Sequence, residues 1–192
     1  MKMFETLLAN ILFLLFGMFI YLLLIEYKKT KMGNQALLVI VAAIILMLCM
    51  TFPIPIGNGF IFDLRYIPFI IASLYSGFFV AIPLYLVLNI YRFIIGGPGF
   101  MPSLLLSSLA LVTIPFLHTS FLALKSIKKV IFATVLAFLH VFFYLSSLSF
   151  FFSSLTREFY QTAALVTALQ TFGTGFVMTL LVFFLNAREK PS

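Results

Sequence analysis

Two arginines, Arg65 and Arg92, lie inside otherwise apolar runs of this sequence, within the stretch from Asp63 to Ser107. A guanidinium group near hydrocarbon costs several kcal/mol unless it reaches the interface or finds a partner, so such residues indicate a functional site. Each arginine alone is also compatible with a side chain that extends from a helix end to the interface. The pair, followed closely by a run of glycines, favours a binding site for an anion.

The elements that would position this pair are two apolar helices joined by a turn at Gly77. At about 1.5 Å per residue, Arg65 stands roughly 18 Å before the turn and Arg92 roughly 22 Å after it. Both guanidinium groups are therefore expected at nearly the same depth on one side of a membrane. Tyr85, Asn89 and Arg92 are spaced at i, i+4 and i+7, so they share a helix face that can carry a polar lining.

A glycine-rich turn follows the second arginine. Gly96, Gly97 and Gly99 allow positive φ, and Pro98 cannot continue the helix. The next helix is expected to begin near Met101, so its free N–H groups and positive dipole end would face the two arginines. This arrangement predicts an anion site in outline.

Three short polar side chains flank the pair. Asp63 is expected to cap a helix or to neutralise Arg65 rather than to contact a ligand. Ser103 and Ser107 lie one turn apart and can bond either a ligand or the carbonyl one turn back. The residues predicted to bind the ligand are Arg65, Asn89, Arg92, Gly96, Gly97, Ser103 and Ser107.

The composition is typical of an integral membrane protein of helical type, because the 192 residues are 64% hydrophobic, only 9% charged, and include 26 phenylalanines. We therefore expect an all-α fold, a polytopic bundle of six to seven transmembrane helices. The third apolar segment is short, and it either tilts or forms a half-buried hairpin with the fourth, which would leave six spans. The seven segments are residues 5–26, 35–52, 62–76, 78–95, 101–123, 130–152 and 161–186.

Cationic residues form three groups in short loops beside the apolar segments. The net charge of +7 is therefore expected to attract the anionic inner leaflet of the bilayer rather than nucleic acid. Under the positive-inside rule all three groups are cytoplasmic, which places the N-terminus outside, the C-terminus inside and the arginine pair toward the outer face. The groups are Lys28, Lys29 and Lys31; Lys125, Lys128 and Lys129; and Arg188 with Lys190.

Patterns for catalysis, cofactors or metal binding are missing from the sequence. Cys49 is the only cysteine, and neither His118 nor His140 has partners at metal-ligand spacing. No phosphate-binding loop, nucleophile elbow or carboxylate pair is present, so we expect no enzyme activity in this chain. In the last segment, Gly173 and Gly175 indicate close helix contacts. A polar stripe on the same segment is expected to face the bundle interior: Thr167, Gln170, Thr171 and Thr174.

Four short motifs make the chain resemble the LytS/YhcK-type five-transmembrane receptor module. The resemblance covers about residues 35–186, which divides the chain into an N-terminal helix and basic loop at 1–34, the module at 35–186 and a tail at 187–192. The motifs are Asp63-Leu64-Arg65, Ala72-Ser73-Leu74-Tyr75-Ser76-Gly77, Tyr91-Arg92 and Gly96-Gly97.

The resemblance implies a sensor of the bacterial plasma membrane. Members form the N-terminal part of sensor histidine kinases, including those of cell-wall control, and of diguanylate cyclases. Some are associated with small carboxylates such as pyruvate, so Arg65 and Arg92 become carboxylate contacts, with Ser103 as a third. Receptor kinases act as dimers, so a homodimer is implied as well.

Two features separate this chain from the resemblance, and two other readings stay open. The 192 residues contain no GAF, kinase or GGDEF output domain, and the second arginine helix has Ala81-Ile82-Pro83 where relatives are richer in glycine. The module also distantly resembles the substrate-binding subunits of energy-coupling-factor transporters, which gives the alternative function. A structural or regulatory membrane protein without a ligand is the third reading.

Overall fold

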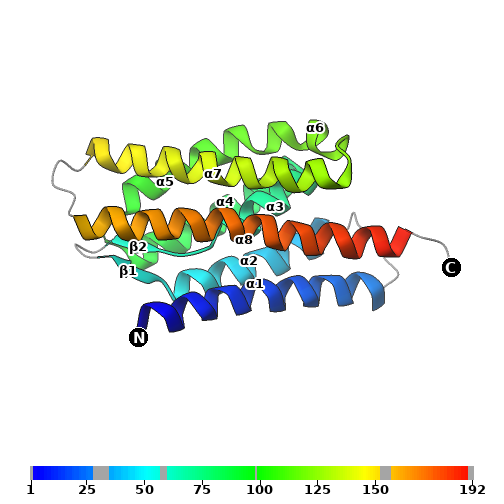
Figure 1. The fold of residues 1–192 in the computed structure, drawn as a ribbon, viewed down its shortest axis with the longest axis horizontal. Coiled ribbons are helices and arrows are strands. Elements are labelled where there is room, and N and C mark those ends of the chain that lie inside the picture. The colour runs from blue at the N-terminus through cyan, green and yellow to red at the C-terminus, as the bar shows by residue number, and fades with distance from the viewer. Residues whose placement is uncertain (1, 28–34, 57–59, 98, 152–156, 190–192) are drawn as a thin grey trace.

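The computed structural model describes residues 2–27, 35–56, 60–97, 99–151 and 157–189, which form a bundle of helices with a small β-hairpin at one end (Figure 1). The predicted all-α membrane bundle is confirmed, and the hairpin is an addition to it. The elements are α1 (Lys2–Tyr27), α2 (Gln35–Thr51), β1 (Ile54–Ile56), β2 (Phe60–Phe62), α3 (Tyr66–Ser76), α4 (Phe78–Ile95), α5 (Phe100–Thr113), the 3-10 turn η1 (Pro115–Leu117), α6 (His118–Leu122), α7 (Ser126–Phe151) and α8 (Arg157–Glu189).

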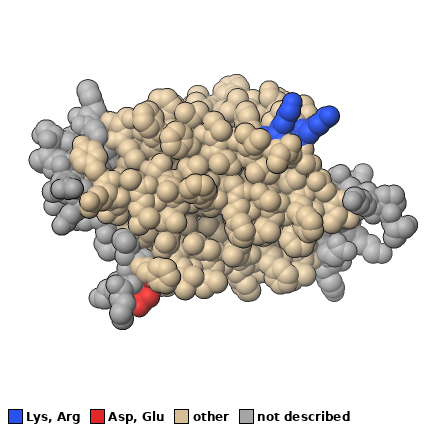
Figure 2. All heavy atoms as spheres, in the orientation of Figure 1, with Lys and Arg blue, Asp and Glu red and all other residues tan. Residues whose placement is uncertain are grey.

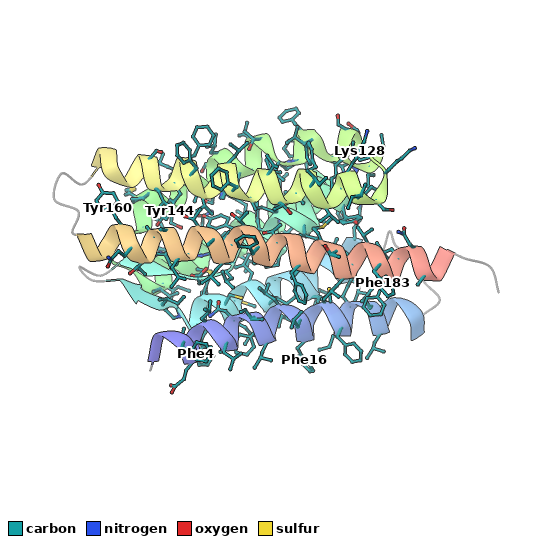
Figure 3. The ribbon with its side chains drawn as sticks, viewed as in Figure 1. Phe4, Phe16, Lys128, Tyr144, Tyr160 and Phe183 are labelled. Atoms are coloured by element: carbon teal, nitrogen blue, oxygen red, sulfur yellow. The ribbon has the colours of Figure 1, made fainter. Side chains whose placement is uncertain are left out.

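Five helical stretches of the described chain are long and apolar enough to cross a membrane. Their outward faces carry large apolar side chains that water would not tolerate as one surface but that lipid covers, such as Phe16, which is 64% exposed (Figure 3). The stretches are Phe4–Leu23, Phe78–Ile95, Phe100–Leu122, Ser126–Ser147 and Tyr160–Ala187. The two remaining apolar helices are shorter, with 17 residues in α2 and 11 in α3.

The short helix α3 is the buried centre of the bundle. It contacts α2, α4, α6, α7 and α8, and all of its residues from Ile67 to Leu74 are buried. A helix that is apolar on every side is stable only when other helices surround it. The third apolar segment of the sequence is therefore short because neighbouring helices enclose it. It forms a hairpin with α4 through Gly77, whose φ is +63°.

The fifth apolar segment is not one helix, because Pro115 interrupts it. Proline lacks the N–H that an α-helix needs, so α5 ends at Thr113 and the chain continues through η1 into α6. His118 at the start of α6 bonds the Leu74 carbonyl through Nδ1 at 2.9 Å. This bond ties the α5–α6 break to the C-terminal end of α3.

The β-hairpin fixes the chain that leads into α3. β1 and β2 pair antiparallel with Ile54 opposite Phe62. The buried side chain of Asn10 on α1 donates to the Phe52 carbonyl at 2.7 Å and accepts from the Leu64 N–H at 3.4 Å. These bonds hold the segment that begins at Asp63, and the bundle end that carries the hairpin is called the hairpin end below.

The opposite end of the bundle is basic. The last residues of α1 and α8 and the junction of α6 with α7 meet there (Figure 1). Lys125, Lys128 and Lys129 lie at this junction, and lysine or arginine side chains stand out on this side of the molecule in Figure 2. The group at Lys28–Lys31 and Lys190 lie outside the described residues. We call this the basic end.

Candidate functional site: a polar cavity inside the bundle

A small cavity of about 30 Å³ lies inside the helix bundle toward the hairpin end. Four separate parts of the chain form its wall: the β2–α3 junction, α5, α7 and α8. Such a volume holds about one or two water molecules. The lining residues are Phe62, Asp63, Arg65, Tyr66, Ser103, Leu106, His140, Val141, Tyr144, Val166 and Gln170.

Six polar atoms around this cavity are buried and lack a hydrogen-bond partner within the described chain. A buried polar atom without a partner costs about 1–3 kcal/mol, so a group of them in one place calls for an occupant. All but the Asp63 oxygen can donate a hydrogen bond in at least one protonation or tautomeric state. The atoms are Asp63 Oδ2, Arg65 Nη1, Tyr66 OH, Ser103 Oγ, His140 Nε2 and Gln170 Nε2.

Asp63 and Arg65 form a buried ion pair. Oδ1 of Asp63 accepts from Nε of Arg65 at 2.7 Å and from the Arg65 backbone N–H at 3.1 Å. Asp63 therefore neutralises Arg65, one of the two roles expected for it, and bonds the N–H at the start of α3. Its side chain is fully buried, so the pair holds the Arg65 guanidinium in place against the cavity, with Nη1 left free.

Arg92 lies near this pair but does not line the cavity. It is 2% exposed, lies within electrostatic reach of Arg65 and Asp63, and donates to the Gly96 carbonyl at the end of its own helix. The two arginines thus share one end of the bundle, as the helix lengths predicted. Arg92 is absent from the one ion pair found among the described residues, so it adds a positive charge beside a neutral pair.

Asn89 and Ser107 bond one another instead of facing the cavity. Ser107 Oγ donates to Asn89 Oδ1 at 3.0 Å, and Asn89 Nδ2 donates to the Tyr85 carbonyl at 2.9 Å. The Tyr85 hydroxyl bonds Ser108 Oγ at 3.0 Å. The polar face predicted on α4 therefore exists, but it joins α4 to α5. Of the two predicted serines, only Ser103 lines the cavity.

Two of the three glycines expected to take positive φ in this turn do so, with φ of +71° at Gly96 and +91° at Gly97, whereas Gly99 has φ −76°. The first turn of α5 nevertheless offers few free donors. The Phe100 N–H bonds the Gly97 carbonyl, the Ser103 N–H bonds the Gly99 carbonyl, and proline at 102 has none. Side chains rather than the start of α5 thus supply the donors of this site.

Besides Asp63, four polar lining residues lie outside the predicted ligand-binding set: Tyr66, His140, Tyr144 and Gln170. The polar stripe of the last segment did point inward, since Gln170 and Thr174 are buried, so that signal could have found Gln170. His140 packs its ring 4.6 Å from the Tyr66 ring. Nothing in the sequence shows that these residues from α3 and α7 meet, because they lie more than 70 positions apart.

The comparison that decides the family is a match between residues 18–184 and the family model 5TM-5TMR_LYT, described as the 5TMR of 5TMR-LYT. The chain belongs to this receptor family. The resemblance seen in the sequence is thereby confirmed. Comparison with curated proteins and with solved structures returned no match.

The 5TMR-LYT match covers every residue that lines the polar cavity. It begins within α1, whereas the sequence placed the module at residues 35–186. A five-transmembrane receptor domain is a sensor module of a membrane, and the five long apolar stretches fit that description. The cavity is therefore the internal polar feature of a receptor domain.

Proposed function

We propose that this receptor domain senses a small anion with a carboxylate-like group, which binds in the polar cavity beside Arg65. The observation that carries the proposal is the excess of unpaired donors at the cavity. Arg65, Tyr66, Ser103 and Gln170 each offer a side-chain N–H or O–H, while Asp63 Oδ2 is the single unpaired atom there that only accepts. An anion that accepts several hydrogen bonds complements such a wall.

The charges near the cavity favour the same ligand. Asp63 and Arg65 neutralise one another, and the buried Arg92 leaves one positive charge in excess. An uncompensated charge away from water is costly, and a singly charged anion would offset it. Ligands of the pyruvate type, which the family resemblance suggested, carry this charge.

The small volume of the cavity means that its wall must move when a ligand binds. About 30 Å³ is too little for a carboxylate with its substituent, so binding must displace side chains of the wall. The side chain of Gln170 on α8 is a candidate for this displacement, because no hydrogen bond holds its Nε2 in place. Ligand binding and a shift of α8 are thus coupled in the proposal.

α8 is suited to carry the signal to the basic end. From Gln170 to the end of α8 at Glu189 the helix runs about 28 Å, which crosses most of a bilayer core. Just beyond Gln170, a Cβ at Gly173 would lie 2.9 Å from Ile67 Cδ1 and one at Gly175 would lie 2.8 Å from Thr134 Oγ1. The sequence indicated close helix contacts at these glycines, and in the proposal these contacts with α3 and α7 transmit a small displacement of α8.

The remaining parts of the proposal concern orientation and output. The hairpin end faces the outside and the basic end the cytoplasm of a bacterial plasma membrane, because the lysines gather at the latter. The output is that of a phosphorelay kinase or a diguanylate cyclase, and the domain acts as a homodimer. Cell-wall control is one such output.

Thermal unfolding of the purified protein in detergent tests the proposal. We expect one or more small carboxylates from a panel to raise the unfolding temperature with concentration, because a ligand that binds only the folded state stabilises it. The uncharged amide of the same acid is the matched control and should have no effect. A panel in which acid and amide act equally would rule out the anion site.

A further inference from the structure

We propose that a second, larger cavity in the bundle binds one acyl chain of an amphiphile whose anionic head group is held by Lys125 and Lys129. This site lies toward the basic end and does not depend on the function proposed above. The shared chemistry is an acyl chain with a negatively charged head, whether a free fatty acid or an anionic phospholipid.

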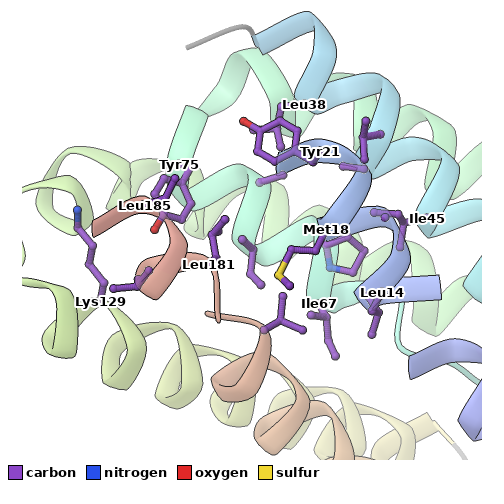
Figure 4. Close-up of a pocket in the computed structure, with 18 of the residues that line it drawn as sticks. Leu14, Met18, Tyr21, Leu38, Ile45, Ile67, Tyr75, Lys129, Leu181 and Leu185 are labelled. Carbon is purple, nitrogen blue, oxygen red and sulfur yellow. The ribbon is translucent and has the colours of Figure 1, made fainter. Parts of the chain in front are cut away.

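The cavity has a volume of about 470 Å³, is partly open to the surface, and is lined by α1, α2, α3, α8 and the α6–α7 junction (Figure 4). Protein interiors rarely leave voids much larger than a water molecule, and this volume lies in the range of ligand pockets, about 300–1,000 Å³. The cavity is therefore too large to be a packing defect.

The inner wall of the cavity is apolar. Leu14 and Met18 of α1, Ile45 of α2, Ile67 of α3 and Leu181 of α8 are among the side chains that surround it in Figure 4. Water is disfavoured in a cavity of this kind, which stays dry or takes up an apolar molecule. In a membrane the abundant apolar molecule of suitable shape is an acyl chain.

The polar residues of the cavity gather at one end. Lys125 and Lys129 line it there, with Ser126 and Asn186, which bond one another at 3.0–3.2 Å. Lys129 Nζ lies 5.8 Å from the centre of the Phe121 ring, at the basic end of the bundle. Two ammonium groups beside an apolar chamber complement a negative head group and repel a cationic one.

Lysine variants supply a matched pair for the charge. Lys125 and Lys129 line the cavity, whereas Lys128 does not. Lys128 is a close match for Lys125, because both side chains are exposed, while Lys129 is half-buried. Each lysine near an anionic head group contributes to the binding free energy. The double variant Lys125→Gln/Lys129→Gln should therefore weaken binding by about 10- to 30-fold. Lys128→Gln should leave binding unchanged.

Because the chain contains no tryptophan, one introduced tryptophan reports on the cavity. Tyr21 lines the cavity and is 9% exposed, while Phe19 on the same helix is 54% exposed toward lipid. In mixed micelles, we expect brominated stearate or brominated phosphatidylglycerol to quench Tyr21→Trp fluorescence saturably. Brominated phosphatidylcholine should quench Tyr21→Trp only at a concentration about tenfold higher. Phe19→Trp should be quenched by all three probes alike.

The three brominated probes separate the outcomes. Quenching by stearate alone assigns a free fatty acid, and quenching by both anionic probes assigns an anionic phospholipid as well. Equal quenching of Tyr21→Trp by phosphatidylcholine, or an unchanged preference in Lys125→Gln/Lys129→Gln, overturns the anionic head group. No quenching of Tyr21→Trp by any probe overturns the site.

Native mass spectrometry of the unaltered chain gives a second test that needs no tryptophan. The protein incubated with stearate should retain one bound molecule. Ala42→Phe, which fills the cavity, should lose it, while Ala36→Phe, the same change on the exposed face of α2, should keep it. A stearate adduct that survives Ala42→Phe, or none on the unaltered protein, contradicts the proposal.

Discussion

Asp63 holds Arg65 through a single carboxylate oxygen, which accepts from both the Nε and the backbone N–H of the arginine. The other carboxylate oxygen and Nη1 of the guanidinium stay unpaired against the cavity. One half of the ion pair therefore positions the start of α3, and the other half is available to a ligand.

We predict that Arg65→Ala destabilises the protein as well as abolishing anion binding. The substitution leaves the buried Asp63 carboxylate without its partner, which costs about 3–5 kcal/mol. The double variant Asp63→Asn/Arg65→Ala removes both charges and should recover a large part of the free energy of unfolding. Urea titration in mild detergent measures both values.

The ligand response separates the two roles of this pair. Asp63→Asn/Arg65→Ala should stay unresponsive to the carboxylate even though its stability recovers. If the double variant is as unstable as the single one, the pair is not the cause of the loss. If it still responds to the ligand, Arg65 is not a contact.

We predict opposite behaviour for two buried serines one turn apart on α5. Ser103→Ala removes a hydroxyl that lies beside the Tyr66 hydroxyl without a hydrogen bond of ordinary length, so the free energy of unfolding should change little, while anion affinity falls about tenfold. Ser107→Ala removes a hydroxyl bonded to Asn89 and should cost about 0.5–1.5 kcal/mol. Anion affinity should not change in Ser107→Ala.

Thermal unfolding with and without the carboxylate checks this pair. Loss of the ligand response in both variants would return Ser107 to the site, where the sequence had placed it. Loss of stability in Ser103→Ala would mean that its hydroxyl has a structural partner.

The sequence predicted most of the helical segments and the placement of Arg65 and Arg92 at one end of the bundle, because both follow from apolar run length and helix rise. It could not predict the cavity wall, since Tyr66, His140 and Gln170 reach it from helices far apart in the chain. The position of a polar side chain on its own helix does not show which neighbours it meets. For the same reason the sequence placed Asn89 at the ligand, whereas in the structure it bonds Ser107 and joins α4 to α5.

Helix ends were predictable where backbone chemistry determines them. Glycines at 77, 96 and 97 do adopt positive φ, as turn residues were expected to. The break at Pro115 was missed because hydropathy continues unchanged across it. The burial of α3 depends on five neighbouring helices, which no local pattern records.

We predict that Gly77→Ala and Gly96→Ala each destabilise the protein by about 1–3 kcal/mol. At φ +63°, ψ −150° and φ +71°, ψ −160° both residues occupy a backbone region that side-chain-bearing residues avoid. A Cβ at Gly77 would also reach the His118 ring at 3.4 Å, whereas one at Gly96 meets nothing within 4 Å. Chemical unfolding, with Ser76→Ala as a control of ordinary helical conformation, checks the size of the effect.

The comparison of the two glycines also measures the His118 contact. Equal losses would show that backbone strain accounts for the whole effect. No loss at either position would contradict the turn conformations themselves.

We predict that the basic end faces the cytoplasm. The native Cys49 is fully buried, so it should not react with a maleimide, and single cysteines can be introduced in the unaltered background. Lys128→Cys, at the basic end, should be labelled only after the membrane is permeabilised. Glu5→Cys, in the first turn of α1 at the hairpin end, should be labelled in intact cells. The reverse pattern would invert the orientation.

We predict last that Arg92→Gln removes the preference of the site for an anion over its neutral amide. The excess positive charge near the cavity comes from Arg92, since Arg65 is already neutralised by Asp63. Because Arg92 does not line the cavity, its charge acts on the anion at a distance and not through a hydrogen bond, so losing it should weaken carboxylate binding by roughly tenfold. Arg92→Lys retains the charge and should keep most of the preference, measured by isothermal titration with the acid and the amide.

Arg92 also donates to the Gly96 carbonyl, so a purely structural role is the competing explanation. That role predicts a lower unfolding temperature for both variants and an unchanged ratio of acid to amide affinity, which would show that the Arg92 charge does not act on the ligand.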